Sequence, residues 1–336
     1  MIHAGLPEGH VTSETLNGGS PTSYTYDSTN QLTNDGTKAY SYDANGNRTM
    51  TGYQTGAGNR LTNDGVYTYT YDDEGNLSKK SKGASAETWT YTYDNRNQLV
   101  GVTERSTDGG GTLLFQGTYV YDVFNNRVEA DEYSNLSGTT TVTKSVYAEP
   151  GTIFADLTSG NAMQTRYLHQ DDSQYSPVLA RIDGGGVAWL LLDRQGSTRN
   201  VVDGSGTLIG TLTYDGFGGV TAESDATKSG AYGYVGYRRD RQLGTYRPDA
   251  SARPTYDPAI GRWTTTDPSG FPDGPNPYWY VHNNPTNGTD PAGLQNLVEI
   301  HNNVNWGRNW GQSGAFIGGV LGGMGVPGGL GLLPKK

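Results

Sequence analysis

The chain has 336 residues and a formal net charge of −10, with a hydrophobic fraction of 33% and a mean hydropathy of −0.65. The charge argues against nucleic acid or an anionic membrane as the main partner, and the lack of cysteine excludes disulfides, thiolate catalysis and zinc–thiolate sites. A core of Leu, Ile and Val would be thin, but 24 tyrosines against 6 phenylalanines indicate a tyrosine-lined sheet.

Residues 1–21 are interpreted as an irregular N-terminal segment. The first residues provide neither a basic n-region nor an apolar h-region, so no secretory signal is predicted. No run of 18 apolar residues occurs in the chain, so no ordinary transmembrane helix is expected either.

The segment 22–188 repeats a Tyr-x-Tyr-Asp phrase. The successive copies end at Asp27, Asp43, Asp72, Asp94 and Asp122. The two tyrosines are two positions apart, so both rings lie on one face of a strand. Turn residues such as Asn-Gly follow each Asp, so each unit is predicted to be strand, turn, strand. The uneven spacing of the aspartates, 16, 29, 22 and 28 residues, favours a coiling antiparallel sheet over a strict solenoid. The predicted class is all-β.

A denser block follows at 189–294. It contains Asp193-Arg194-Gln195-Gly196-Ser197-Thr198-Arg199 and Tyr256-Asp257-Pro258-Ala259-Ile260-Gly261-Arg262-Trp263. After residue 294 the Tyr-Asp units stop and a glycine-rich apolar run begins, so the boundary at 294/295 is predicted to separate this block from a variable, non-β tail at 295–336.

These phrases resemble the Rhs/YD-repeat family, and the block at 189–294 is similar to its Rhs-associated core. Asp193–Arg199 matches D-x-x-G-S-x-R, Tyr256–Trp263 matches Y-D-P-x-x-G-R-[FW], and 276–285 is similar to N-L-Y-x-Y-x-x-N-N-P. The resemblance covers roughly 22–294. It implies a YD-repeat sheet that spirals into a β-shell around a C-terminal toxin or effector, with a core that closes one end and cuts the chain. Five clear repeats are few, so a partial, open shell is expected, with edge strands that need a partner.

Two phrases in the block carry acids: Asp267-Pro268-Ser269-Gly270 and Asp290-Pro291-Ala292-Gly293-Leu294. Each predicts a rigid turn that presents a carboxylate, and paired acids are what an aspartyl-type hydrolytic site requires. The resemblance assigns Asp267 and Asp290 to self-cleavage of the Leu294–Gln295 bond. The alternative is that each Asp only caps the backbone of its own turn.

Two further residues are candidates for support of this site. Asp273 is a spare acid for either role, and Arg262 is either an ion-pair partner of an acid or a strand residue solvated at the rim. The chain departs from the family pattern at Thr266, where many members have Arg, and in the interrupted lead-in at 252–258.

No cofactor or metal is expected. Asp43-x-Asn45-x-Asn47 resembles the start of a calcium loop, but its glycine is at loop position 4 and its twelfth residue is Gln54. The GxGxxG string at 323–328 has no βαβ context.

The tail of 42 residues is too short for a typical enzymatic toxin domain. Its glycines at intervals of four would suit helix packing in lipid, but glycine and Pro327 make a helix costly, which favours a degenerate remnant.

Three functions follow from these observations. In the first, the chain is a shell segment that encloses its own tail as cargo and releases it by aspartyl autoproteolysis in cis, with upstream Rhs shell segments as partners. In the second, it is a non-catalytic module at the cell surface that binds glycans or proteins through its tyrosines. In the third, it is an inactive orphan fragment. The resemblance suggests a secreted or cell-surface location.

Overall fold

The computed structural model describes residues 2–5, 10–16, 18–171, 176–249, 255–267, 274–293 and 298–299. In these ranges the regular structure is β, interrupted by three short 3-10 turns, η1 (Ala57–Asn59), η2 (Tyr234–Gly236) and η3 (Val281–Asn283). The all-β prediction is confirmed.

Sixteen antiparallel strands form one sheet, which we call the wall, and their order in space follows their order in the chain from β6 to β21. The two end strands do not pair with each other, so the wall is open. The strands are β6 (Tyr53–Thr55), β7 (Leu61–Asp64), β8 (Thr68–Tyr71), β9 (Leu77–Ser81), β10 (Thr88–Tyr93), β11 (Leu99–Arg105), β12 (Leu113–Tyr121), β13 (Arg127–Ser134), β14 (Thr139–Glu149), β15 (Thr152–Leu157), β16 (Met163–His169), β17 (Val178–Asp183), β18 (Gly186–Leu192), β19 (Thr198–Asp203), β20 (Leu208–Tyr214) and β21 (Val220–Glu223).

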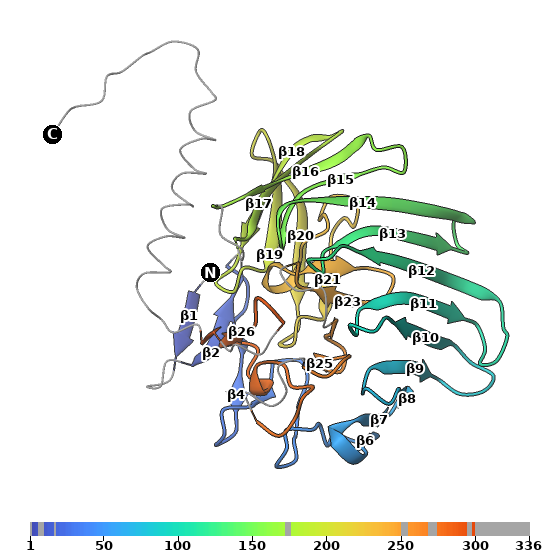
Figure 1. Cartoon of the computed structure of the whole chain (residues 1–336). Helices are drawn as coiled ribbons and strands as arrows, with labels where there is room; N and C mark the ends of the chain where they lie inside the picture. Colours follow the sequence, from blue (N-terminus) through green and yellow to red (C-terminus); the bar gives the residue numbers. More distant parts are fainter. Residues whose placement is uncertain are drawn as a thin grey trace, which may run out of the picture.

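The wall curves around an interior, as Figure 1 shows. A β-bulge recurs at the second tyrosine of the repeat, where the register shifts immediately before Tyr71, Tyr93, Tyr121 and Tyr214. Bulges bend a strand and increase its twist, so a bulge in every unit makes the sheet coil. The predicted partial shell is confirmed.

The aspartate of each repeat folds its own turn. In the Asp94 turn, one carboxylate oxygen accepts the N–H groups of Arg96 at 2.8 Å and Gln98 at 3.0 Å. The N–H of Asn97 bonds to the Asp94 carbonyl, and Asn97 has φ of 60°. This is a type I turn followed by a left-handed residue, which pins the hairpin register. Carboxylates elsewhere accept backbone N–H groups two or four residues on in the same way: Asp27, Asp43, Asp72, Asp122, Asp193, Asp203 and Asp215.

The second tyrosine of the repeat ties each unit to the preceding one. The Tyr93 hydroxyl donates to the Leu77 carbonyl at 3.1 Å, and the Tyr121 hydroxyl donates to the Leu99 carbonyl at 2.9 Å. Each acceptor is the first residue of a strand that follows an Asp turn. Phenylalanine could fill the same space but could not satisfy that carbonyl, which explains the excess of tyrosine.

The N-terminal segment is more ordered than the sequence predicted. Residues 1–21 were expected to be irregular, but β1 (Ile2–Gly5), β2 (Val11–Thr15) and β3 (Thr22–Ser23) form a three-stranded sheet, followed by the pair β4 (Thr25–Tyr26) and β5 (Leu32–Asn34). The contacts that order this segment come from far along the chain, because the Val11 N–H donates to Asn287 Oδ1 at 2.8 Å.

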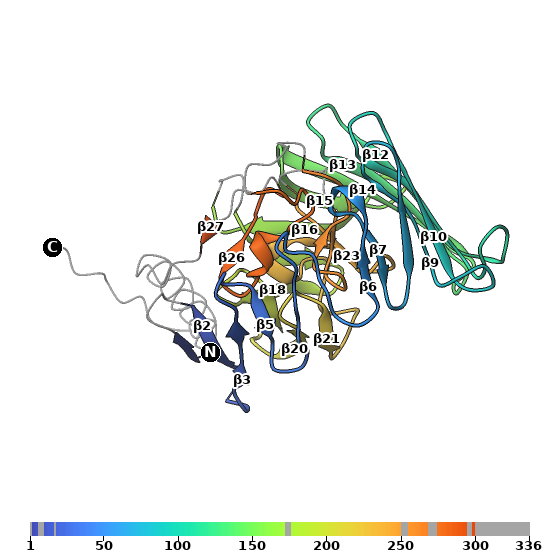
Figure 2. The same cartoon turned by 90° about the horizontal axis from the view of Figure 1, so that it is seen from below.

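Residues 232–249, 255–267 and 274–293, which we call the plug, lie within the curve of the wall (Figure 2). Leu243 and Ile260 pack there against inward-facing tyrosine and leucine side chains of the wall. The regular part of the plug is short: β22 (Arg238–Asp240), β23 (Thr245–Arg247), β24 (Tyr256–Asp257) and β25 (Arg262–Trp263) form one sheet, and β26 (Gly288–Thr289) pairs with β27 (Val298–Glu299).

The pairing of β26 with β27 corrects one detail of the predicted domain plan. The tail after residue 294 was expected to contain no strand, yet Val298 pairs with Thr289 and Glu299 with Gly288. The partner strand β26 belongs to the plug, so the pairing depends on a neighbouring segment and not on any pattern within the tail.

Candidate active site

The second Asp-Pro-x-Gly phrase forms the predicted turn. The Gly293 N–H donates to the Asp290 carbonyl at 3.1 Å, and Gly293 has φ of 63°, which favours glycine. The Tyr237 hydroxyl also donates to the Asp290 carbonyl. Asp290 is 1% exposed, so this acid is enclosed in the plug.

The first acid is also buried, on a neighbouring segment. Asp267 is 7% exposed, and its N–H donates to the Pro277 carbonyl at 3.1 Å. Four residues earlier the Trp263 N–H donates to the Tyr278 carbonyl at 3.0 Å, so the chain from β25 to Asp267 runs beside residues 277–279. The residues that complete the first turn, 268–270, lie outside the described ranges.

Asp290 adjoins an aromatic cluster of the plug through Tyr237, and Asp267 follows Trp263 of this cluster by four residues. The cluster consists of Tyr234, Tyr237, Tyr246, Tyr256, Trp263, Tyr280 and Val281. The centroids of the Tyr256 and Tyr280 rings are 4.2 Å apart and those of Trp263 and Tyr280 are 5.5 Å apart. Burial, and after it the charge of Asp290, raises the pKa of Tyr237 well above its ordinary value. The Asp290 carboxyl therefore lies in a dry, tyrosine-rich surrounding.

The backbone next to this cluster is strained. Val235 has φ of 46° in η2, and Val281 has φ of 42° in η3. β-branched residues rarely occupy this region, so both conformations depend on the packing around them. They flank Tyr234, Tyr237 and Tyr280, which are members of the cluster that adjoins Asp290.

Arg262 is buried at 7% exposure, which excludes the solvated role at the rim that the sequence left open. Its Nη2 donates to the Asn59 carbonyl at 2.7 Å and to Asn276 Oδ1 at 3.3 Å, and its guanidinium stacks on the Tyr278 ring. Arg262 therefore links the plug to the wall.

The remaining predicted residues, Asp273, Leu294 and Gln295, lie outside the described residues. Among the described residues no group of three or more His, Asp or Glu side chains could hold a metal ion. In the same ranges no helix is long and apolar enough to span a membrane. The Asp43 carboxylate, which began the calcium-like phrase, is engaged by the N–H groups of Asn45 and Asn47.

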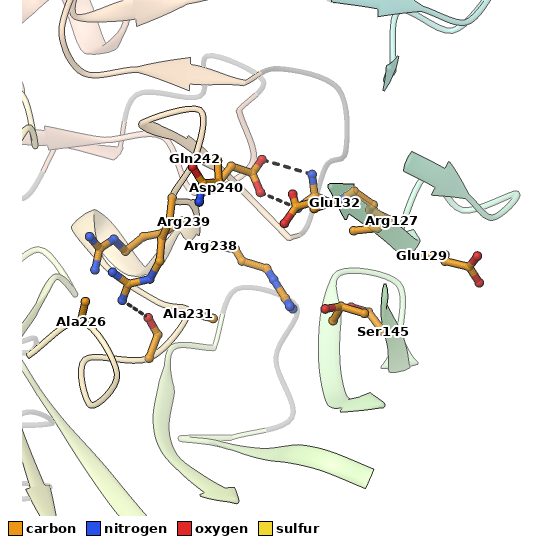
Figure 3. Close-up of a pocket in the computed structure, with 14 residues that line it drawn as sticks. Arg127, Glu129, Glu132, Ser145, Ala226, Ala231, Arg238, Arg239, Asp240 and Gln242 are labelled. Atoms are coloured by element: carbon orange, nitrogen blue, oxygen red, sulfur yellow. Dashed lines mark hydrogen bonds and ion pairs between the residues drawn. The ribbon is translucent and has the colours of Figure 1, made fainter. Parts of the chain in front are cut away.

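The sequence interpretation missed the ionic contacts that join plug and wall. Arg127 of β13 donates to both carboxylate oxygens of Asp240, and Arg238 donates to Asp156 of β15 at 2.6 Å. They border a polar cavity of about 360 Å³ between β13, β14 and the segment 226–242 (Figure 3). The run Arg238-Arg239-Asp240-Arg241 was the available signal, because four consecutive charges are unusual in a chain with 17% charged residues.

Among the described residues, the aromatic rings of the repeats do not form an external platform. Tyr69, Tyr119, Trp89 and Trp263 are buried at 5% exposure or less, and the tyrosines of the repeats face the interior. A glycan-binding face built from the repeat tyrosines would need rings on the outside of the wall.

Comparison with known proteins agrees with this fold. A family model described as Teneurin YD-shell matches residues 10–286. The tRNA3(Ser)-specific nuclease WapA of Bacillus spizizenii is 28% identical over 271 residues, which cover 79% of this chain and 9% of that protein. Toxin subunit YenC1 of Yersinia entomophaga is 29% identical over 231 residues, which cover 61% of this chain and 22% of that protein.

A solved structure gives the same architecture. The crystal structure of TcdB2-TccC3-TEV matches with a TM-score of 0.51 at 19% identity, over 85% of this chain and 17% of that chain. At this identity the likeness concerns the fold. The chain thus spans only about a tenth to a quarter of the length of the proteins that it matches.

Proposed function

Because this chain belongs to the teneurin YD-shell family, as the Rhs/YD-repeat resemblance predicted, we propose that it is the wall and plug of a toxin-like shell that releases its own C-terminal tail by aspartyl autoproteolysis in cis. The relatives carry toxin and nuclease names, and this chain corresponds to a small part of each. Upstream shell segments of the same kind would be its partners and the tail its cargo.

The observation that carries the proposal is the burial of two acids in one small, irregular region. Asp267 and Asp290 are 7% and 1% exposed; Asp290 is bonded by Tyr237 of the aromatic cluster, and Asp267 follows Trp263 of the same cluster by four residues. Carboxylates are rarely buried to this extent unless they are paired or functional. The strained Val235 and Val281 lie in the same cluster, and strain of this kind collects at functional sites.

The chain geometry supports Leu294–Gln295 as the bond that is cut. The Asp290–Gly293 turn ends one residue before Leu294, and β27, which pairs with β26, begins at Val298.

In the proposed reaction, one ionised Asp removes a proton from a water molecule while the other, protonated, donates a hydrogen bond to the Leu294 carbonyl oxygen. The water oxygen attacks the carbonyl carbon, and the C–N bond then breaks as the leaving nitrogen takes up a proton. The products are a new carboxyl terminus at Leu294 and a new amino terminus at Gln295.

Intact-mass analysis of the purified chain tests the proposal. The expected result is a split after Leu294 that disappears in Asp267→Asn and in Asp290→Asn, since Asn cannot act as base or acid. Asp203→Asn is the matched control, because Asp203 also caps a turn but lies at a partly exposed site of the wall and should leave cleavage unchanged. An unmodified chain that stays uncut, or variants that cut normally, would refute autoproteolysis without affecting the assignment to the shell family.

A further inference from the structure

A small, partly open cavity of about 10 Å³ lies where the first repeats meet the plug. Its lining combines two arginines with asparagine and aromatic side chains: Gly46, Asn47, Arg48, Tyr53, Leu61, Ile260, Gly261, Arg262, Asn276, Trp279 and Asn283. Space of this size holds about one solvent-sized sphere.

The first arginine, Arg48, is 8% exposed and only partly satisfied. Its Nη1 donates to the Ala259 carbonyl at 3.0 Å, and its guanidinium stacks on the Phe217 ring at 4.3 Å. Its Nε and Nη2 are buried without a hydrogen-bond acceptor. The Tyr53 hydroxyl approaches the guanidinium but does not meet the geometry of a hydrogen bond to either atom.

The second arginine is Arg262. Its Nη2 donates to the Asn59 carbonyl and to Asn276 Oδ1, and its Nε is likewise buried without an acceptor. Burial lowers the pKa of Arg262, and the nearby positive charge of Arg48 adds to this effect. The two cations thus line one small cavity and repel each other.

Neither cation has a carboxylate partner within ion-pair distance among the described residues. Seven other arginines do form such pairs there: Arg127, Arg181, Arg199, Arg238, Arg239, Arg241 and Arg247. A buried charge is costly unless an opposite charge compensates it. Two buried cations without an ion-pair partner beside one cavity therefore indicate that a ligand supplies the missing negative charge.

We propose that this cavity binds one monatomic monovalent anion, such as chloride, between Arg48 and Arg262. A water molecule could accept only two of the three buried N–H groups and would leave both charges uncompensated. Phosphate, sulfate or a carboxylate has several heavy atoms and exceeds the space. The bound anion accepts these N–H groups and fastens the 46–48 turn to the plug segments 259–262 and 276–283.

Bromide provides a direct test on the unmodified chain. Crystals grown in sodium bromide should show an anomalous scattering peak in the cavity. A cavity with only a water-like peak and no anomalous signal would overturn the proposal.

The solution test compares unfolding in sodium chloride and in sodium gluconate at equal ionic strength, because gluconate is too large to enter. Above the dissociation constant, each tenfold rise in chloride should lower the apparent unfolding equilibrium constant about tenfold. Arg262→Met and Arg48→Met keep the apolar stem but remove one charge, and should lose this dependence. Arg96→Met, at an exposed site, should retain it. Identical unfolding of the unmodified chain in both salts would contradict the proposal.

Discussion

The wall and the plug are built on opposite principles. In the wall, every strand pairs with its neighbours in sequence, and each unit repeats the same aspartate turn and the same tyrosine-to-carbonyl bond. In the plug, strands are two or three residues long, and the contacts that hold it come from the far end of the chain. The Tyr278 hydroxyl, for example, donates to the Gly75 carbonyl at 2.7 Å.

This difference has an energetic consequence. Stabilisation of the wall is divided among many similar neutral or singly charged hydrogen bonds, each of modest net value. The plug depends on a few buried charges and large rings, whose loss leaves uncompensated groups or cavities. We therefore expect single substitutions in the plug to cost several times more than matched substitutions in the wall.

The largest effect is expected where the two regions meet, at the Arg127–Asp240 pair. Asp240 is 5% exposed and accepts both guanidinium nitrogens of Arg127, at 2.5 and 3.1 Å. Asp240→Ala leaves Arg127 buried and unpaired, and should lower the free energy of unfolding by about 3–5 kcal/mol in urea titrations. The double variant Arg127→Leu/Asp240→Leu should lose clearly less. A loss below about 1 kcal/mol for Asp240→Ala would mean that the pair does not hold the plug.

The next largest effect is expected at Glu223, in the end strand β21 of the wall, and it depends on pH. Burial alone would favour the neutral form of Glu223, but hydrogen bonds from Arg239, Ser229 and Arg241 lower its pKa to about 2. The folded state therefore favours the carboxylate. The stability contributed is fully present above pH 4.5, the ordinary pKa, and is lost as the pH falls toward 2.

Urea unfolding between pH 6 and pH 3 checks this prediction. Glu223→Gln should cost about 1–2 kcal/mol at pH 6, a value reduced for partial exposure, and the difference from the unmodified chain should shrink toward pH 3. Glu74→Gln, at an exposed turn, is the control and should show no pH-dependent difference. A difference that stays constant across this range would exclude the ionised Glu223 as its source.

The same contrast determines how much could be predicted from the sequence. Fold class, strand direction and the Asp turns of the wall were predictable because each is encoded within about ten residues by Tyr-x-Tyr-Asp and a following Gly or Asn. The N-terminal strand β2 was not, since Val11 is ordered by Asn287, 276 positions away. Periodicity carries no information about a contact at that distance.

In the plug, the sequence located Asp267, Asp290 and Arg262 but not their surroundings. The turn at Asp290–Gly293 follows from local chemistry, whereas the burial of Arg262 depends on Asn59 and Asn276. The Arg127–Asp240 pair was missed because its members stand 113 residues apart, one in the wall and one in the plug.

Within the repeat units of the wall, the turn aspartates should matter more than the tyrosine hydroxyls. Asp94→Ala removes the acceptor for the N–H groups of Arg96 and Gln98 and should lower the free energy of unfolding by about 1 kcal/mol, measured by urea titration. Asp73→Ala changes an exposed turn residue next to the capping Asp72 and should be nearly neutral. Equal effects of the two variants would show that the capping bonds add nothing to the turn.

The smallest effect on the free energy of unfolding is expected when a tyrosine of the wall loses its hydroxyl but keeps its ring. Tyr121→Phe keeps the ring in its cluster but removes the bond to the Leu99 carbonyl, and should cost about 0.5–1 kcal/mol in the same titration. Tyr133→Phe, whose hydroxyl bonds to no described residue, should be neutral. Because Tyr93 makes the equivalent bond one unit earlier, to Leu77, Tyr93→Phe should cost the same amount, and the double variant should cost the sum. A double variant far more costly than that sum would mean that the tyrosine bonds act together along the wall and not as separate bonds of modest value.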